Sequence, residues 1–260
     1  MPHHRSLAPP ADARATATPI IHAELRKHYD EVYDLLLDGR SARTTGLALD
    51  IGSGDGSALG AIALGTGLRG VALERAPSER WLGPGGWQVV QADASRLPFG
   101  DGAFGAALML DVFEWLRHPG VALAEAERVT HGPIVVVQTD WDGLWFECEE
   151  AETGRELTRM FTSGAPQALS KTLAACATDA GLTIRQRRSI TIRSERLAPG
   201  SLAWDVLGTM RRWLVIEAAR IRARRFDDWL GELHAAAAEG HFSMLLRRLV
   251  WVFEGSGRSA

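Results

Sequence analysis

Residues 50–56 combine residue types that can bind a ligand: Asp50 is followed by Gly52, Ser53, Gly54 and Gly56. The apolar run before Asp50, residues 47–49, predicts a buried parallel strand, and a helix is expected over residues 57–64. Glycine has no Cβ, so the backbone between strand and helix can adopt positive φ and lie close to a ligand. The first amides of the helix lack helical partners and point to the same place. The spacing therefore predicts a loop that holds a nucleoside-like ligand against bare backbone.

Two more short apolar runs end in an acid. Residues 70–74 end at Glu74, which Arg75 follows, and residues 89–94 contain Asp93 and Ala94. An acid after the second strand of a βαβ unit can accept hydrogen bonds from both ribose hydroxyls of an adenosine. The glycine order differs from the dinucleotide fingerprint, because the three glycines alternate and an acid precedes them.

The segments that follow complete a recognisable order. Leu97-Pro98-Phe99 precedes an expected strand over residues 105–110, then come residues 111–116, and residues 134–137 predict a fifth strand. Taken together, residues 46–140 resemble the class I S-adenosylmethionine (SAM)-dependent methyltransferases, and most closely the type 11 group, which includes quinone-biosynthesis C-methyltransferases. Two departures are visible. Trp115 stands where many relatives carry histidine, and Ser53-Gly54-Asp55 replaces the commoner Cys-Gly-Thr.

The resemblance implies SAM as cofactor, S-adenosylhomocysteine as product, and a set of cofactor contacts at the strand ends. In that family the acid at Asp93 meets the adenine amino group, and the segment after the fourth strand closes over the methionine end. The implied cofactor-binding residues are Asp50, Gly52, Ser53, Gly54, Gly56, Glu74, Arg75, Asp93, Ala94, Leu110, Asp111 and Trp115.

The resemblance also implies an α/β fold: a doubly wound, Rossmann-like, mostly parallel seven-stranded sheet with an antiparallel final strand and helical cap elements. We expect a disordered tail over 1–19 and one domain over 20–260. Within this domain we expect a cap helix in 20–45, the SAM-binding core in 46–140, helical insertions over the substrate pocket in 141–180 and 193–240, and the final strand in 241–254. Helices are also expected at 119–129, 150–161, 165–180, 201–225 and 226–238, and a strand at 182–192.

Methyl transfer is a direct displacement, so the protein mainly orients and desolvates the reactants. A phenol, alcohol or activated carbon would also need a base within hydrogen-bond reach. The candidates are Asp111 first, Asp142 second and then His118, with His22, His28 and Asp140 as further choices. A mechanism without a base stays open. Tyr29, Tyr33, Trp141 and Trp145 are the candidate substrate-pocket residues, with Phe146, Trp204 and Trp213 as possible additions; core packing is the alternative for all of them.

Composition limits the function classes. The chain has 260 residues, of which 46% are hydrophobic and 23% charged, and a net charge of −3, which argues against general nucleic-acid binding. No apolar run approaches the ~18 residues of a membrane span, and none resembles a signal peptide. The two cysteines, Cys148 and Cys176, show no metal-ligand spacing, and no metal is expected. We therefore expect a cytoplasmic monomer or homodimer.

These features predict a methyltransferase that moves a methyl group from SAM to an O, N or C nucleophile of a small organic metabolite in bacterial secondary metabolism. Two alternatives come from other classes. One is an enzyme of the same fold that uses bound SAM for cyclisation or elimination without methyl transfer. The other is a non-catalytic assembly partner, in which damage to the glycine loop or to the acids after the second and third strands would be expected.

Overall fold

A computed structural model describes residues 23–37, 47–63, 68–77, 79, 81–147, 151–162, 169–217 and 220–255. The expected tail over 1–19, His22 and Cys148 lie outside the described residues. None of the described helices is both long and apolar enough to cross a membrane.

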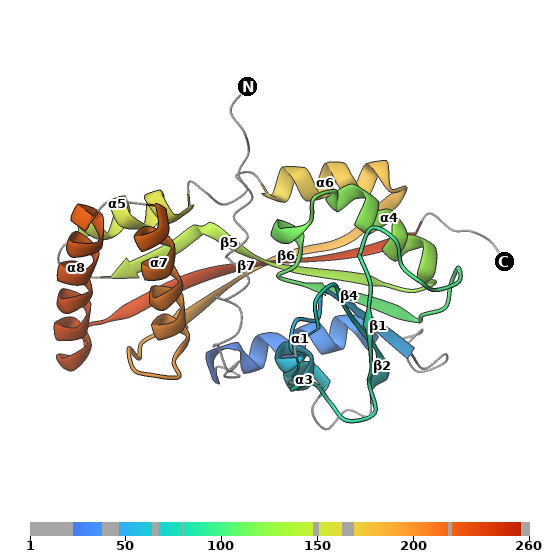
Figure 1. Ribbon diagram of the computed structural model, residues 1–260, viewed down its shortest axis with the longest axis horizontal. Helices are drawn as coiled ribbons and strands as arrows, with labels where there is room; N and C mark the ends of the chain where they lie inside the picture. The colour runs from blue at the N-terminus through green and yellow to red at the C-terminus, as the bar shows by residue number, and fades with distance from the viewer. Residues whose placement is uncertain are drawn as a thin grey trace. The chain divides into compact units, whose positions relative to one another are not determined.

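Seven strands form one sheet in the order β3-β2-β1-β4-β5-β7-β6 (Figure 1). The strands are β1 (Leu47–Ile51), β2 (Arg69–Glu74), β3 (Gln88–Gln91), β4 (Ala106–Leu110), β5 (Ile134–Glu147), β6 (Leu182–Ser194) and β7 (Ser243–Gly255). The pairs β1–β2, β1–β4, β2–β3 and β4–β5 are parallel, and β7 is antiparallel. This order and the antiparallel final strand confirm the fold predicted from the sequence.

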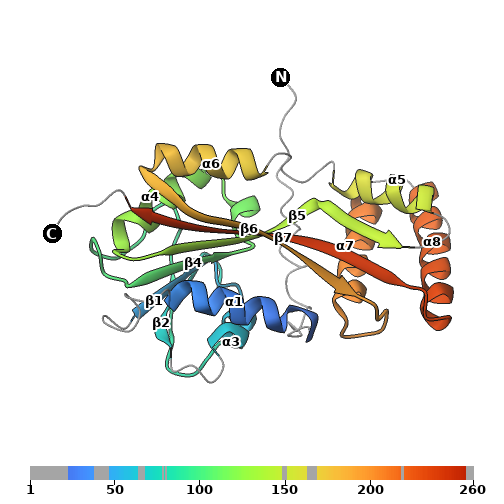
Figure 2. The ribbon, with the colours of Figure 1, turned by 180° about the vertical axis from the view of Figure 1, so that it is seen from behind.

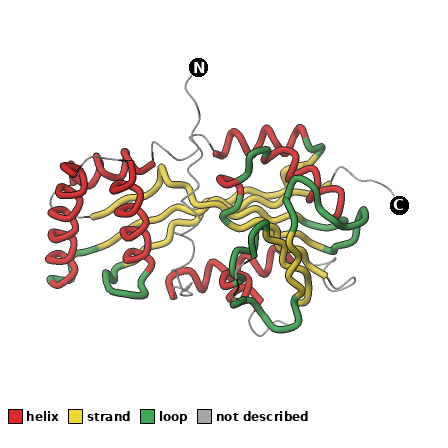
Figure 3. Tube along the Cα trace, viewed as in Figure 1, coloured by secondary structure: helices red, strands yellow, loops and turns green. Residues whose placement is uncertain are grey.

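The helices are α1 (Arg26–Leu37), α3 (Ser57–Ala63), α4 (Pro119–Val129), α5 (Ala151–Thr162), α6 (Leu169–Asp179), α7 (Leu202–Glu217) and α8 (Arg220–Ala238), with 3-10 turns η2 (Ala23–Leu25) and η3 (Phe113–Trp115). The break expected between residues 225 and 226 is wrong, because α8 already begins at Arg220. Within α8, the buried residues Phe226, Trp229 and Leu233 recur at helical spacing. No described residue between β2 and β4 is helical, so these strands are joined by loops (Figure 3).

The fifth strand is far longer than expected, and this changes the placement of three aromatic residues. Its first six residues are buried, as in a strand that is covered on both faces, and residues 144–147 then alternate between buried and exposed. Trp141, Trp145 and Phe146 therefore lie on β5 and not in a helical insertion behind it. The apolar run ends at Val137, and its pattern does not predict that Gln138, Thr139 and Asp140 continue the strand.

The chain divides into two compact units. Unit 1 comprises Met1–Leu25, Asp140–Gln167 and Thr191–Arg247, and unit 2 comprises Arg26–Thr139, Ala168–Ile190 and Arg248–Ala260. In unit 2, α1 and α3 lie on one face of the sheet and α4 and α6 on the other (Figures 1 and 2). In unit 1, α5, α7 and α8 contact one another.

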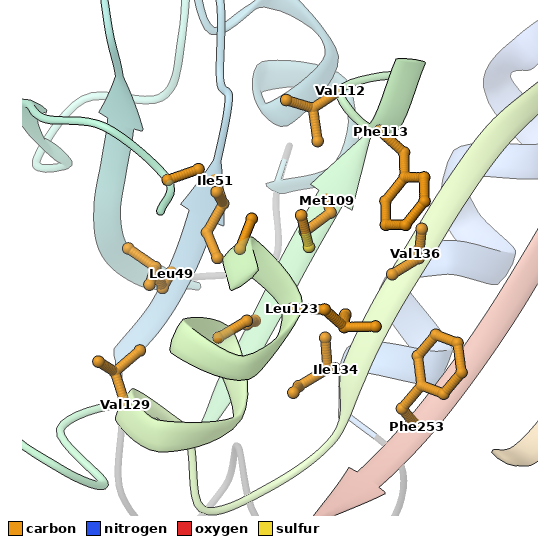
Figure 4. Close-up of a cluster of buried hydrophobic side chains, with 14 of the residues drawn as sticks. Leu49, Ile51, Met109, Val112, Phe113, Leu123, Val129, Ile134, Val136 and Phe253 are labelled. Carbon is orange, nitrogen blue, oxygen red and sulfur yellow. The ribbon is translucent and has the colours of Figure 1, made fainter. Parts of the chain in front are cut away.

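The core of unit 2 explains why α4 forms where it does. Pro119 occupies the first turn, and the buried residues Leu123 and Val129 point from α4 toward the strands. They meet Leu49 and Met109 in one apolar cluster (Figure 4). Burial of each such side chain contributes about 1.5–3 kcal/mol. This packing holds β1 and β4, whose carboxyl ends carry the candidate site.

Candidate cofactor and substrate sites

The glycine loop between β1 and α3 adopts the left-handed backbone that its sequence predicts. The φ angles of Gly52, Gly54 and Gly56 are +78°, +58° and +83°. The three positions differ in their surroundings. A Cβ at Gly52 would overlap the Val112 side chain, and one at Gly56 would overlap the Trp81 ring, whereas a Cβ at Gly54 would meet nothing within 4 Å. Gly52 and Gly56 thus serve packing, and Gly54 leaves space that a ligand can fill.

The expectation of bare loop amides is wrong for the five residues whose amide bonds are described. The amides of Gly52 and Ser53 donate to the Leu73 carbonyl (2.7 and 3.1 Å), and the Gly56 amide donates to the Ser53 carbonyl (2.9 Å). The Gly54 amide donates to Glu74 Oε2 (3.1 Å), and the Ser57 amide donates to Asp55 Oδ1 (3.1 Å). These bonds arise because β2 lies directly beside β1, which brings the Leu73 carbonyl under the loop. The loop therefore offers a ligand an open side at Gly54 and a neighbouring carboxylate, rather than a row of free donors.

Glu74 ends β2 and fixes the loop. Its carboxylate accepts hydrogen bonds from the amides of Gly54 (3.1 Å) and Ala76 (3.2 Å). The next residue, Arg75, is exposed, and its carbonyl accepts a bond from Gln91 Nε2 (3.1 Å). Glu74 is half-buried, so its carboxylate stands at the edge of the loop where the sequence predicted a ribose contact.

Asp50 lies inside β1, one residue before the strand ends, and its side chain is buried. Burial, and then the negative charge of Glu74, raise the pKa of Asp50 from 3.8 to about 7. The sequence placed Asp50 at the end of the strand, as a residue that touches the cofactor. Its position inside the strand gives it a supporting place behind the loop.

Asp93 follows β3 and caps its own turn. One carboxylate oxygen accepts bonds from the Ser95 amide (2.8 Å) and hydroxyl (2.6 Å), and these bonds hold the pKa of Asp93 below its usual value. The neighbouring Ala94 is buried. The amide of Ala92 donates to the Glu74 carbonyl (3.2 Å), so Asp93 and Glu74 stand after adjacent strands at the same edge of the sheet.

Asp111, the first candidate base, is held in a network just past Leu110, the last residue of β4. It has a φ of +50°, and its Oδ1 accepts bonds from the Thr139 amide (2.9 Å) and hydroxyl (3.0 Å). Its Oδ2 forms an ion pair with Arg248 Nη1 (2.6 Å). Both carboxylate oxygens of Asp111 are therefore engaged with Thr139 and Arg248. Its arrangement suits it to position other groups.

The other candidates near this edge lie at the surface. Trp115 belongs to η3 and is partly exposed, and His118 precedes α4, is exposed and makes no side-chain cap bond. The charge of His118 contributes to lowering the pKa of Asp93, which places the two side chains within electrostatic range.

On α1, Tyr29 is buried and burial raises its pKa, whereas Tyr33 is half-buried.

Unit 1 contains a pocket of about 260 Å³ between β5 and α5. It is lined by Trp141, Asp142, Leu144, Trp145, Phe146, Gly154, Arg155, Thr158, Arg159 and Thr162. Four sequence candidates, Trp141, Asp142, Trp145 and Phe146, thus meet in one pocket. Trp204 instead packs on His234, and the Trp213 side chain lies outside the described residues. Asp140 pairs with Arg247 (2.6 Å) and does not line the pocket.

Residues 49–133, which contain the glycine loop and all three strand-end acids, match the family described as "Methyltransferase domain". The sheet order and the antiparallel β7 are those of the SAM-dependent class. This chain has the class I SAM-dependent methyltransferase fold.

A curated protein is similar to this chain over most of its length. An uncharacterised 37.1-kDa protein of transposon Tn4556 from Streptomyces fradiae is 28% identical over 214 residues, which is 77% of this chain and 61% of that protein. The chain thus spans about three fifths of that relative's length.

Among solved structures, a candidate methyltransferase from an antibiotic biosynthesis pathway of Anabaena variabilis has a TM-score of 0.59 at 14% identity, covering 86% of this chain and 96% of the other. A candidate methyltransferase of Bacillus halodurans has a TM-score of 0.53 at 14% identity, covering 86% and 98%. The YcgJ protein of Bacillus subtilis has a TM-score of 0.52 at 16% identity, covering 89% and 100%. At these identities the likeness is one of fold.

Two buried polar residues near the candidate site were missed or not singled out by sequence reasoning. Arg248 on β7 was not a candidate, although it interrupts an alternation of buried apolar residues with a cation, at Met244, Leu246, Arg248 and Val250. His28 was one histidine among several candidates, and the structure buries it on α1. Among the described residues, no three histidine, cysteine, aspartate or glutamate side chains are grouped to hold a metal.

Proposed function

We propose that this chain binds SAM at the glycine loop and transfers its methyl group to a small organic acceptor, releasing S-adenosylhomocysteine. The observation that carries the proposal is the open side of Gly54, where positive φ and empty space coincide beside the Glu74 carboxylate. A side chain at position 54 would fill this cradle, so the residues fit a nucleoside that lies against the backbone.

Each part of the loop has a function in this proposal. Glu74 accepts hydrogen bonds from the ribose, and Asp93, at the same edge, receives the adenine end. The bonds from the loop amides to Leu73 and Glu74 hold the loop in shape before the ligand arrives, which reduces the ordering cost of binding. When bound, SAM supplies the electrophilic methyl group, and the protein contributes orientation and exclusion of water.

The unit 1 pocket supports a small, partly aromatic acceptor. Its walls include the indoles of Trp141 and Trp145, and Arg155 lies over the Trp145 ring with 5.9 Å between the guanidinium carbon and the ring centroid. Asp142 lines this pocket and is exposed, so it is the carboxylate best suited to accept a proton from an acceptor hydroxyl. Secondary metabolism is part of the proposal; a protein of the same fold from Anabaena variabilis is named as a candidate methyltransferase of an antibiotic biosynthesis pathway.

The test measures binding and turnover separately. Isothermal titration should show S-adenosylhomocysteine binding, and incubation of SAM with a panel of small phenols and aromatic acids should give methylated product and S-adenosylhomocysteine in equal amounts. Absence of binding up to millimolar ligand would refute the proposal. Consumption of an acceptor without consumption of SAM would replace methyl transfer by a SAM-assisted rearrangement.

A pocket-filling variant separates the acceptor from the cofactor. Thr158→Trp places an indole in the unit 1 pocket and should abolish turnover while leaving S-adenosylhomocysteine affinity unchanged, since Thr158 is not part of the glycine loop. Thr172→Trp, at an exposed position of α6 outside the pocket, is the matched control and should retain turnover. Full turnover by Thr158→Trp would show that the acceptor does not bind in the unit 1 pocket.

A further inference from the structure

Arg248 presents an unused hydrogen-bonding edge inside the protein. The residue lies on β7 and its side chain is 5% exposed. Its Nη1 atom donates to Thr139 Oγ1 (2.6 Å) and pairs with Asp111 Oδ2 (2.6 Å). Its Nε and Nη2 atoms are buried and have no hydrogen-bond partner among the described residues. Buried donors without partners are destabilising, so an acceptor at this edge would stabilise it.

The two unpartnered nitrogens of Arg248, Nε and Nη2, form the edge of a guanidinium that can donate two parallel hydrogen bonds to one ligand group. Nε–H and one Nη2–H of a guanidinium project side by side in a planar fork, which matches the two oxygens of a carboxylate. A structural role in holding Asp111 accounts for Nη1 alone. The Nε–Nη2 edge is therefore a second, independent feature of Arg248.

His28 on α1 provides the second wall of this site. Both of its ring nitrogens are buried without a partner among the described residues, and the side chain is almost fully buried. Burial, and then the charge of Arg248, lower the pKa of His28 to about 4, so the ring is neutral near pH 7 and carries one N–H donor. The charges of Arg248 and Asp111 act on both His28 and Tyr29, which places this part of α1 beside the ion pair.

The Arg248–Asp111 ion pair lies near the glycine loop and reaches the surface through Asp111. The Asp111 side chain is 37% exposed whereas its partner Arg248 is 5% exposed, so the ion pair leads inward from the carboxyl edge of the sheet. The next residue, Val112, packs against Gly52 closely enough to exclude a Cβ there. A ligand at Gly54 would thus have this cluster as a neighbour.

We propose that Arg248 and His28 bind a carboxylate of a ligand, with Arg248 Nε and Nη2 donating to its two oxygens and His28 donating one further hydrogen bond. This inference rests on the proposed function. Two ligands of a methyltransferase could supply the group: the amino-acid end of SAM and S-adenosylhomocysteine, or an acceptor that is a carboxylic acid.

The experiment compares S-adenosylhomocysteine with 5′-methylthioadenosine, which has the same nucleoside and thioether but no carboxylate, by isothermal titration. Arg248→Lys keeps the charge and removes the planar fork. The matched control is Arg247→Lys, the adjacent residue, which pairs with Asp140 and lies outside the cluster. If the cofactor supplies the carboxylate, Arg248→Lys should bind S-adenosylhomocysteine about 10-fold or more weakly and methylthioadenosine with wild-type affinity, and Arg247→Lys should change neither.

If the acceptor supplies the carboxylate, affinity for S-adenosylhomocysteine should be unchanged, and benzoate should bind the wild-type complex and Arg247→Lys but not Arg248→Lys. Equal binding of all three probes by wild type and Arg248→Lys would overturn the inference. Should Arg248→Lys fail to fold in a thermal melt, His28→Gln is measured in its place, with the same expectations. If wild type binds neither nucleoside, the proposed function fails, and benzoate binding to the protein alone still decides the inference.

Discussion

Gly54 differs from the other two glycines of the loop in the space around its Cα. All three loop glycines have positive φ, but only at Gly54 would an added Cβ meet open space. Replacement at Gly52 or Gly56 would force Val112 or Trp81 to move and would disturb folding as well as binding. Replacement at Gly54 tests the ligand site itself.

Gly54→Val should weaken S-adenosylhomocysteine binding by about 100-fold or more, roughly 3 kcal/mol, because the branched side chain occupies the cradle. The positive φ adds about 1–2 kcal/mol of destabilisation. Isothermal titration and a thermal melt measure the two effects. Gly85→Val is the control, since Gly85 also has nothing within 4 Å of an added Cβ but no positive φ. Equal affinity of Gly54→Val and wild type would remove the ligand from this loop.

At the carboxyl edge of the sheet, a hydrogen bond from the glycine loop to the end of β2 holds the loop in place, and α3 contributes less. α3 has seven residues, and the Ser57 amide at its start is capped by Asp55. Glu74, the last residue of β2, instead bonds across to the Gly54 amide, so the second strand fixes the loop of the first. Glu74 thus holds the loop in shape, and in the proposed function it also accepts hydrogen bonds from the ribose. Two substitutions can distinguish these functions.

Glu74→Ala should weaken S-adenosylhomocysteine binding by about 1–3 kcal/mol, because both the ribose acceptor and the bond to Gly54 are lost. Glu74→Gln keeps an oxygen for the Gly54 amide and removes the charge, so its affinity should lie between those of Glu74→Ala and wild type. Titration calorimetry of the three proteins measures the order. Wild-type affinity in Glu74→Ala would show that this carboxylate does not touch the ligand.

For the whole molecule, two buried groups give opposite dependences of stability on pH. Asp50 has a folded pKa of about 7 against 3.8, so the folded protein holds a proton that the unfolded chain releases, and stability falls as pH rises from about 4 to 7. His28 has a folded pKa of about 4 against 6.5, so the unfolded chain binds the extra proton, and stability rises across about pH 4 to 6.5. The two contributions largely cancel in the wild type.

Single substitutions should reveal each contribution. Relative to wild type, Asp50→Asn should gain stability with rising pH, since only the His28 effect remains, and His28→Gln should lose stability over the same range. Each difference should reach a few kcal/mol. Urea unfolding at about pH 4.5, 5.5, 6.5 and 7.5 measures them. Curves for both variants that run parallel to the wild-type curve would contradict the burial of these two charges.

Local patterns in the sequence were sufficient for most elements. The helix at Pro119–Val129 was predicted with its observed bounds, because a proline begins it and Ala122, Leu123, Ala126 and Val129 recur at helical spacing. The antiparallel final strand was expected from the resemblance and an alternation that begins near His241. Where the pattern changed within an element the prediction stopped early, as in β5, whose polar residues at 138–140 interrupt the apolar run.

By itself the sequence determined the class of sheet with its antiparallel final strand, the left-handed glycine loop and the acids that follow the strands, since these follow from short-range spacing and a shared motif order. Only the tertiary structure showed which loop amides are already bonded, that Trp141, Asp142 and Trp145 line one pocket, and that Arg248 reaches Thr139 across 109 residues of chain. Burial and hydrogen bonding between distant segments depend on how strands pair, and one strand's sequence does not specify its neighbour's side chains.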